Sequence, residues 1–154
     1  MTDRLTALED WAAGLLEQLE PAARRRLARG LGKTLRHSQQ QRIRSQRNGD
    51  GTQYIPRKPR NLRAKAGRVK RKTRMFKRLQ TARFLKLRTD SDGVTVGYSG
   101  RAAGIGRVHQ FGLKAQAEKG APFLKYSARE ILSFTAKDLD EIRTALLAQL
   151  NRSR

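Results

Sequence analysis

The sequence predicts a small α+β domain with N-terminal helices, a basic extended arm, a small antiparallel sheet of about three or more strands, and a C-terminal helix. Three observations carry this prediction. Apolar residues recur at helical spacing near both ends of the 154-residue chain. Shorter segments in the middle alternate between apolar and polar residues around turn signals. The third observation is that residues 55–88 include no acidic residue. We expect one domain over residues 1–154, with the arm at about 52–74.

Two helices are expected before the arm. The first follows from a stripe of apolar residues, Leu5, Leu8, Ala12, Leu15 and Leu19, and its surface is acidic. The second begins at Pro21, because the missing N–H of proline costs nothing in a first helical turn. Gly30 and Gly32 each weaken it by about 1 kcal/mol relative to Ala and indicate a bend or a close helix contact. The NGDG sequence at 48–51 is a turn signal that ends this helix.

The arm concentrates the positive charge of the chain. Lys and Arg number 35 against 13 Asp and Glu, which gives a formal net charge of +22. Like charges at this density repel one another, so the segment must meet a negative partner. The candidate partner-binding residues are its cations: Arg57, Lys58, Arg60, Arg63, Arg68, Lys70, Arg71, Lys72 and Arg74.

The middle of the chain predicts a helix and a hairpin. Met75, Phe76 and Leu79 would share one side of a helix within residues 69–82. Residues 84–89 and 94–98 alternate on either side of a turn at 90–93, which is typical of a β-hairpin.

The rest of the chain predicts a short helix, a third strand and a last helix. The short helix covers about residues 102–111, with Gly112 as the residue after its end and with Ile105, Val108 and Phe111 facing inward. Residues 113–121 are expected as a loop and residues 123–129 as the strand. The last helix opens at Thr135, whose hydroxyl can cap it while Asp138 stands three residues on.

The sequence contains no recognisable catalytic or metal-binding set. There is no Cys, and no Ser or Thr has a paired His and acid at a familiar spacing. The two histidines, His37 and His109, lack Asp or Glu at metal-ligand spacing, so we expect structural or interfacial roles for them. We therefore expect no enzyme activity, no cofactor, no metal and, without a long apolar run, no membrane contact.

Two classes of binding protein remain. The arm would release counterions from phosphate groups, which makes a nonspecific nucleic-acid-binding protein the first class. The second class is an assembly protein whose arm lies against acidic protein surfaces. Composition alone favours nucleic acid.

Short segments along almost the whole chain carry a resemblance to a known family. The sequence resembles the phage virion morphogenesis family, the tail completion proteins of contractile-tailed phages. The resemblance rests on the order and spacing of these segments in the sequence: LLEQL at 15–19, PAARRRLAR at 21–29, SQQQRI at 38–43, NGDG at 48–51, YIPRKP at 54–59, MF at 75–76, RFLK at 83–86, RVHQFG at 107–112, YSAR at 126–129 and LSF at 132–134. Glu130 stands where the family pattern has Pro, which leaves the local turn open.

The resemblance implies a structural protein that completes the tail at its head-proximal end and enables head–tail joining. It implies other tail and neck or connector proteins as partners, a homo-oligomeric ring with a hexamer favoured, and a place in the virion tail or neck after assembly in the host cytoplasm. DNA stays the alternative partner of the arm. From the family motif at 107–112 we single out four residues with an expected structural role: Arg107, His109, Phe111 and Gly112.

Overall fold

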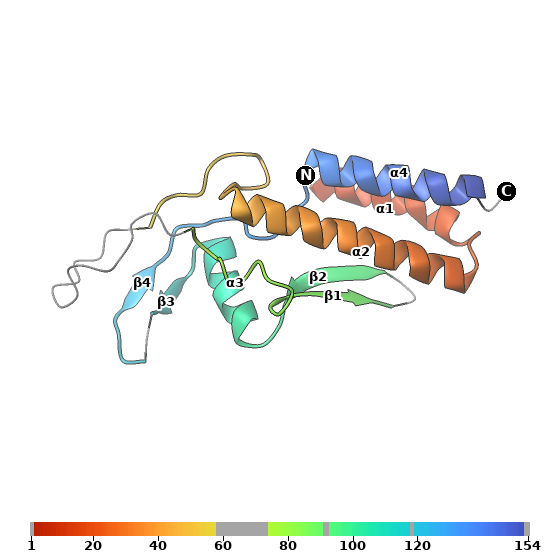
Figure 1. The fold of residues 1–154 in the computed structure, drawn as a ribbon. Coiled ribbons are helices and arrows are strands. Elements are labelled where there is room, and N and C mark those ends of the chain that lie inside the picture. Colours follow the sequence, from red (N-terminus) through yellow and green to blue (C-terminus); the bar gives the residue numbers. More distant parts are fainter. Residues whose placement is uncertain (1, 58–73, 91–92, 118, 153–154) are drawn as a thin grey trace.

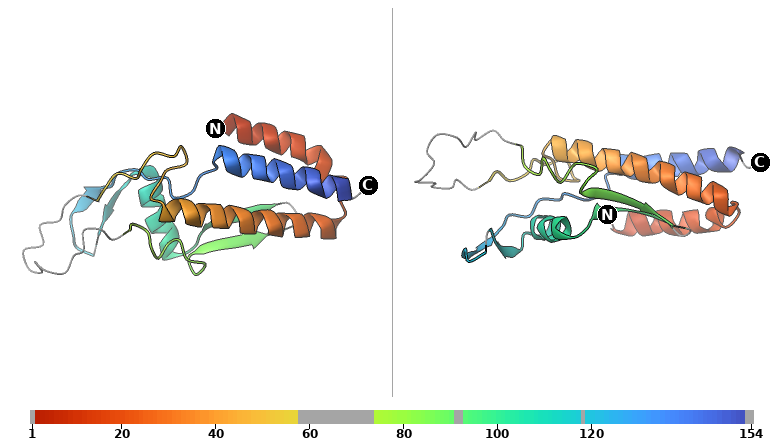
Figure 2. Two further views of the ribbon diagram at one scale, coloured as in Figure 1. Left: turned by 45° about the horizontal axis from the view of Figure 1, so that its top comes forward. Right: turned by 60° about the horizontal axis from the view of Figure 1, so that its bottom comes forward.

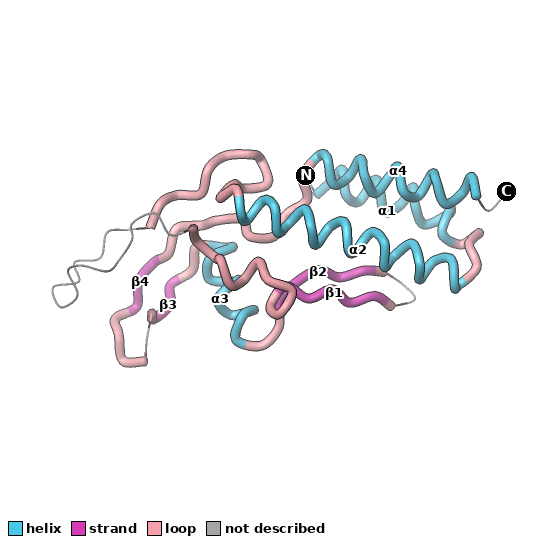
Figure 3. The backbone as a smooth tube through the Cα atoms, viewed as in Figure 1, coloured by secondary structure: helices cyan, strands magenta, loops and turns pink. Residues whose placement is uncertain are grey.

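The computed structural model describes residues 2–57, 74–90, 93–117 and 119–152. In chain order the described elements are α1 (Thr2–Leu16), α2 (Pro21–Arg44), β1 (Leu85–Thr89), β2 (Val94–Tyr98), α3 (Arg101–Phe111), β3 (Lys114–Gln116), β4 (Phe123–Lys125) and α4 (Ala136–Arg152). The shape is elongated, with α1 and α4 toward one end, α3 with β3 and β4 at the other, and α2 running from the first end toward α3 (Figure 1). The mixture of helices and small antiparallel sheets (Figure 3) confirms the α+β class.

Helices α1, α2 and α4 lie side by side, with α4 in contact with both of the others (Figure 2). The apolar stripes expected from the sequence face this contact, because Leu8 of α1, Leu35 of α2 and Leu146 of α4 are all buried. Helix α4 begins as predicted. The hydroxyl of Thr135 accepts a hydrogen bond from Asp138 N at 3.1 Å, and the Asp138 carboxylate accepts one from Thr135 N at 2.8 Å.

The first hairpin, β1 with β2, packs against α2. The strands are antiparallel, with Leu85 opposite Tyr98 and Thr89 opposite Val94. Gly32 explains how the helix comes so close, since a methyl group there would overlap Leu87 Cδ1 and lie 2.5 Å from Val94 Cγ2. The two alternatives that the sequence left open for Gly32 are thereby resolved in favour of a close contact, made with the hairpin.

A small core lies where α2, α3 and the first hairpin meet. Four buried residues form it, Ile43, Leu79, Ala102 and Ile131. Phe76, Phe84 and Tyr98 pack around them and are partly buried. These residues come from segments spread over most of the described chain. This core therefore joins the end of the fold that contains α1 and α4 to the end that contains α3.

Helix α3 ends as predicted, but its inward face differs from the expected one. Gly112 has the left-handed φ of 63° that suits glycine at a helix end. Ile105 and Phe111, expected to face inward, are 51% and 66% exposed. Ala102 and Gly106 are buried instead. Gly106 lies against Tyr98, so the side of α3 that meets the hairpin is its small-residue side.

Three other local predictions are corrected. Residues 75–80 form hydrogen-bonded turns instead of a helix, and Phe76 has a φ of 61°, which a right-handed helix does not accommodate. The expected loop at 113–121 contains β3. The expected strand at 123–129 is shorter, and β4 pairs with β3 in a second hairpin, so the strands form two two-stranded sheets in the described chain.

Candidate functional site

The structure describes the two flanks of the basic arm. One flank ends at Arg57 and the other begins at Arg74, and both of these arginines are exposed. The remaining candidate residues of the arm lie outside the described residues: Lys58, Arg60, Arg63, Arg68, Lys70, Arg71 and Lys72. We call residues 54–57 and 74–76 the arm base, and the site is built from the groups that hold it.

Gln46 bonds to both flanks. It follows the end of α2 and has a positive φ of 58°, which turns its carbonyl and side chain toward the arm base. Its carbonyl accepts a hydrogen bond from Tyr54 N at 2.7 Å. Its side-chain amide accepts one from Met75 N at 2.8 Å and donates one to Met75 O at 3.0 Å. A single residue thus fixes the separation of the two flanks.

Arg129 holds the first flank from the other side. It is 4% exposed, and its guanidinium donates to Ile55 O at 2.7 Å and to Pro56 O at 3.1 Å. Burial, followed by the nearby charge of Arg57, lowers the pKa of Arg129. The neighbouring Tyr54 hydroxyl donates to Glu130 O at 3.0 Å, and burial raises its pKa, which keeps it a donor.

Four rings stack edge to face from the arm base into α3 and beyond. The ring centroids of Tyr54 and Phe76 are 5.8 Å apart, those of Phe76 and His109 are 4.8 Å apart, and those of His109 and Tyr126 are 5.0 Å apart. Edge-to-face contacts of this kind contribute about 0.5–1.5 kcal/mol each beyond burial. Because Tyr54 precedes the arm and Phe76 follows it, their contact closes the arm at its base.

His109 is a packing residue in this row of rings. Burial lowers its pKa to about 4, and the positive charges of Arg129 and Arg57 act in the same direction. The ring is therefore neutral near pH 7. Within the described part of the chain its buried Nδ1 has no hydrogen-bond partner. Such an environment disfavours the proton exchange that a general base requires.

The other residues of the family motif divide into two groups. Arg107 and Phe111 are exposed on the surface of α3. Gly112 is enclosed, because a methyl group there would lie 2.9 Å from Ala128 N. The motif therefore combines two inward-packed residues, His109 and Gly112, with two that face outward.

Sequence reasoning missed a set of buried and partly buried polar side chains that binds residues 130–133. Arg42 of α2 donates to Glu130 O at 2.5 Å and to Ile131 O at 2.9 Å. Gln110 of α3 accepts from Ile131 N at 2.8 Å. Gln39 donates to Ser133 O at 2.8 Å. In a chain so rich in Arg and Gln, nothing in the sequence distinguishes these residues from exposed ones.

Glu130 itself completes the turn that the sequence left open. Its backbone N–H donates to Asn48 Oδ1 at 2.9 Å, and its carboxylate accepts from Gly49 N at 2.9 Å. The NGDG turn therefore binds the segment that precedes α4. Glu130 therefore has a local structural role at the position where the resemblance led us to expect proline.

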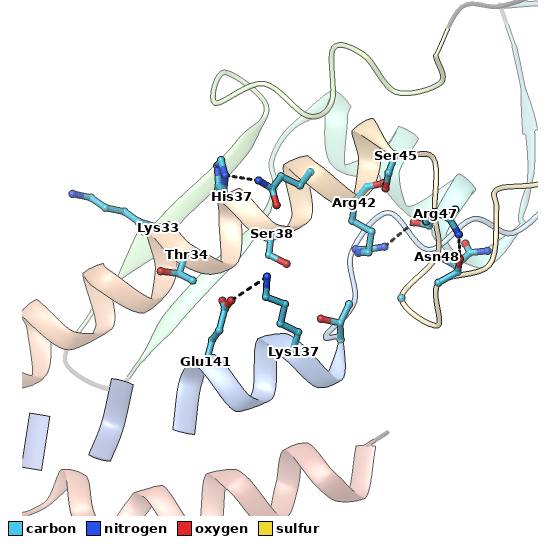
Figure 4. Close-up of a pocket in the computed structure, with 14 residues that line it drawn as sticks. Lys33, Thr34, His37, Ser38, Arg42, Ser45, Arg47, Asn48, Lys137 and Glu141 are labelled. Carbon is cyan, nitrogen blue, oxygen red and sulfur yellow. Dashed lines mark hydrogen bonds and ion pairs between the residues drawn. The ribbon is translucent and has the colours of Figure 1, made fainter. Parts of the chain in front are cut away.

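A groove of about 840 Å³ runs between α2, the turn at 45–51 and the start of α4 (Figure 4). Lys137 and Glu141 of α4 lie across from α2 and form an ion pair, with Lys137 Nζ 3.6 Å from Glu141 Oε1. His37 is hydrogen-bonded to Gln41 at 2.8 Å. Basic side chains outnumber Glu141 among the lining residues, and the rest are hydroxyl and amide groups. The groove therefore has the chemistry of a polar surface.

No group of three His, Asp or Glu side chains in residues 2–57, 74–90, 93–117 and 119–152 could hold a metal ion. In the same residues no helix has the length and apolar character needed to cross a bilayer.

Comparison with known proteins gives a consistent result. A model of the phage virion morphogenesis family matches residues 3–151. Tail completion protein S of Escherichia phage P2 is 44% identical over 145 residues, which cover 94% of this chain and 95% of that protein. No solved structure matches. Because the family model and this relative each cover nearly the whole chain, the protein belongs to the phage virion morphogenesis family.

Proposed function

We propose that this protein completes the phage tail at its head-proximal end and makes it competent to join the head. A structural role in tail completion follows from the family and from the phage P2 relative. Its partners are proteins of the phage tail and head, and its place is the phage particle and the host cell in which particles are built. The head-proximal position, the neck or connector proteins as neighbours, and a homo-oligomeric ring, with a hexamer favoured, are the finer parts of the proposal.

One observation carries the proposal furthest. Tyr54 and Phe76 contact each other, and Gln46 bonds to both flanks, so the start and the end of the arm are fixed at one point of a folded body. An arm presented in this way suits docking at a defined place in an assembly. Charge complementarity between the arm and its partner then steers their encounter and fixes the register in which they bind. The neutral, packed His109 and the polar groove favour a protein without enzymatic activity. We include this absence of activity, and of a cofactor, in the proposal.

The test changes the arm and separates its two candidate partners. Arg68, Lys70, Arg71 and Lys72 are replaced together by Ala, and circular dichroism verifies that the body still folds. Mutant tails are then mixed with DNA-filled heads and with empty heads, and joined particles are counted by electron microscopy. If the arm docks on acidic protein, joining fails with both kinds of head. Failure with filled heads alone identifies DNA as the essential partner and contradicts the proposal.

A salt titration gives a second, independent reading. A DNA-binding arm makes affinity fall with salt at a log–log slope of about −0.9 per phosphate contacted, and the four changes remove up to about four units of that slope. A protein-docking arm leaves only weak, nonspecific DNA binding at physiological salt, on the order of 10⁻⁴ to 10⁻⁶ M. We expect the second behaviour.

A further inference from the structure

The second hairpin exposes both of its faces. Ala115 lies opposite Leu124, and Gln116 lies opposite Phe123. Successive side chains of a strand point to opposite faces, so Leu124 and Phe123 lie on different faces of the hairpin. They are 49% and 68% exposed, which means that no described element covers either face. An isolated two-stranded hairpin is marginally stable in water, so this one is suited to be covered by a partner.

More apolar surface is exposed at the same end of the molecule. Ile105 and Phe111 of α3 are more than half exposed, and Leu113 at the start of the hairpin is 38% exposed. Figure 1 shows α3 and the β3–β4 hairpin together at one end of the fold. Large apolar side chains gathered on one part of a surface mark an interaction site. We call α3 and the β3–β4 hairpin the hairpin end.

The charges of the hairpin indicate what kind of partner fits. Lys114 lies directly opposite Lys125, and both are exposed. Like charges in directly opposed positions destabilise a strand pair. Arg107 on α3 adds another exposed positive charge. An acidic partner with an apolar anchor would relieve the repulsion and cover the exposed rings.

The chain itself carries a surface of this description. Helix α1 has an outward face in which Asp3, Ala7, Asp10, Trp11 and Gly14 follow helical spacing and are all exposed. Trp11 is 40% exposed, and tryptophan is among the residues that most often anchor interfaces. Small residues at positions 7 and 14 leave room for close approach, and a methyl group at Gly14 would meet nothing within 4 Å.

The acidic residues of the chain are concentrated in the segment that contains α1. Within residues 1–20 the only basic residue is Arg4, and the acidic ones are Asp3, Glu9, Asp10, Glu17 and Glu20. The whole sequence has 13 Asp and Glu, so over a third of its acid lies in about an eighth of its length. Two of these acids, Asp3 and Asp10, belong to the outward face of α1, and in a protein with a net charge of +22 they complement the lysines of the hairpin end.

We infer that the outward face of α1 in one copy docks on the hairpin end of the next copy. The two surfaces lie at opposite ends of the fold (Figure 1), so they meet between copies. They are different surfaces, which makes the contact head-to-tail, and a head-to-tail contact closes into a ring when its rotation allows. This inference rests on the proposed function, since it assigns the surfaces that build the proposed ring.

The test uses two variants of the full chain, each with one surface changed. The hairpin variant carries Phe123→Ser and Leu124→Ser. The helix variant carries Asp10→Lys and Trp11→Ala. All four positions are exposed, and thermal unfolding verifies that each variant folds. Sedimentation velocity then gives the size of each species. The wild type is expected as an oligomer larger than a dimer, and each variant alone is expected to associate about 30-fold more weakly or worse.

Mixing the two variants gives the decisive result. The helix variant keeps an intact hairpin end and the hairpin variant keeps an intact α1 face, so one interface remains between them. An equimolar mixture is therefore expected to form heterodimers and to stop there. A Leu147→Ser variant is the matched control, because Leu147 is 45% exposed but belongs to α4 and to neither surface, and it is expected to keep the wild-type size. A chain with both Asp10→Lys and Lys125→Glu is expected to regain association relative to Asp10→Lys alone.

Several results would overturn the inference. A monomeric wild type, variants that associate as the wild type does, or a mixture that rebuilds the full oligomer would each contradict a head-to-tail contact. If the hairpin variant keeps its oligomer but no longer binds tails, the hairpin end belongs to another tail or head protein. In that case the inference fails and the proposed function stands. If variants that no longer associate still complete tails normally, the contact stands and the proposed ring function fails.

Discussion

The two hairpins of this molecule differ in what covers them. The first, β1 with β2, lies under α2, and its Leu85 has no exposed surface. The second, β3 with β4, has three exposed residues in β4. Both are short antiparallel pairs, so their backbones alone do not explain the difference. The first hairpin is covered by the chain's own helix α2, whereas the residues of β4 in the second are exposed.

The largest expected contrast comes from one leucine in each hairpin. Leu85→Ala removes a fully buried side chain and is expected to lower the free energy of unfolding by about 2–5 kcal/mol. Leu124→Ala changes a side chain that is about half exposed, and the expected loss is within about 0.5 kcal/mol. Urea denaturation of both variants measures the difference. Equal losses would mean that the second hairpin is as buried as the first.

A pair of glycines in α2 tests how closely the first hairpin packs. Gly32→Ala forces a methyl group against Leu87 and the stiff side chain of Val94, with an expected loss of about 1–3 kcal/mol. Gly30→Ala is the matched control, because a methyl group there meets nothing within 4 Å, and it is expected to stabilise the helix by about 0.5–1 kcal/mol. The unfolding temperatures of the two variants should shift in opposite directions relative to the wild type. A stabilising Gly32→Ala would disprove the close contact.

His109, at the end of the helix that links the two hairpins, predicts a dependence on pH. Its pKa is about 4 in the folded protein and 6.5 otherwise, so the unfolded state binds the proton more readily. The contribution of the neutral His109 ring to the free energy of unfolding is fully present above pH 6.5. It is lost as the pH falls toward 4. Because the ring is only half-buried, we expect a loss of about 1–2 kcal/mol. His109→Gln should remove this part of the acid sensitivity, and identical pH profiles would contradict it.

The smallest expected effect concerns the lysines of the second hairpin. Lys125→Thr removes the repulsion from Lys114 opposite and is expected to stabilise the isolated chain by about 0.2–0.5 kcal/mol at low salt. The gain should fade near 1 M salt, where exposed charges are screened. Measurements at protein concentrations below those of self-association separate it from any effect on docking. A loss of stability at low salt would show that Lys125 has a favourable contact within the chain.

The sequence predicts those parts of the fold that follow from periodicity and local turn chemistry. The helices α1, α2 and α4, the first hairpin, the Thr135 cap and Gly112 were all expected from such patterns, and the structure confirms them. The family was also identified from the sequence and is confirmed. These features depend on residues close together in the chain, so a single sequence contains enough information to find them.

The parts that the sequence missed depend on contacts between distant segments. Strand β3 has little apolar alternation and exists through its pairing with β4. Phe76 takes a left-handed conformation in a segment whose side chains suggested a helix. Arg42 and Arg129 are buried because carbonyl groups from remote segments surround them. The arm base could not be assembled from the sequence, since its holding groups lie up to 74 positions away from the flanks they bind.

The closed arm base has a consequence for how the segment between its flanks can change. The contact of Tyr54 with Phe76 and the bonds of Gln46 hold the two flanks of the arm together. Doubling the length of a chain segment between fixed ends costs only about 0.6 kcal/mol in closure entropy. Lengthening this segment therefore costs the fold little. Under the docking role proposed for the arm, an insertion there changes what the protein attaches to while the body that carries it stays the same.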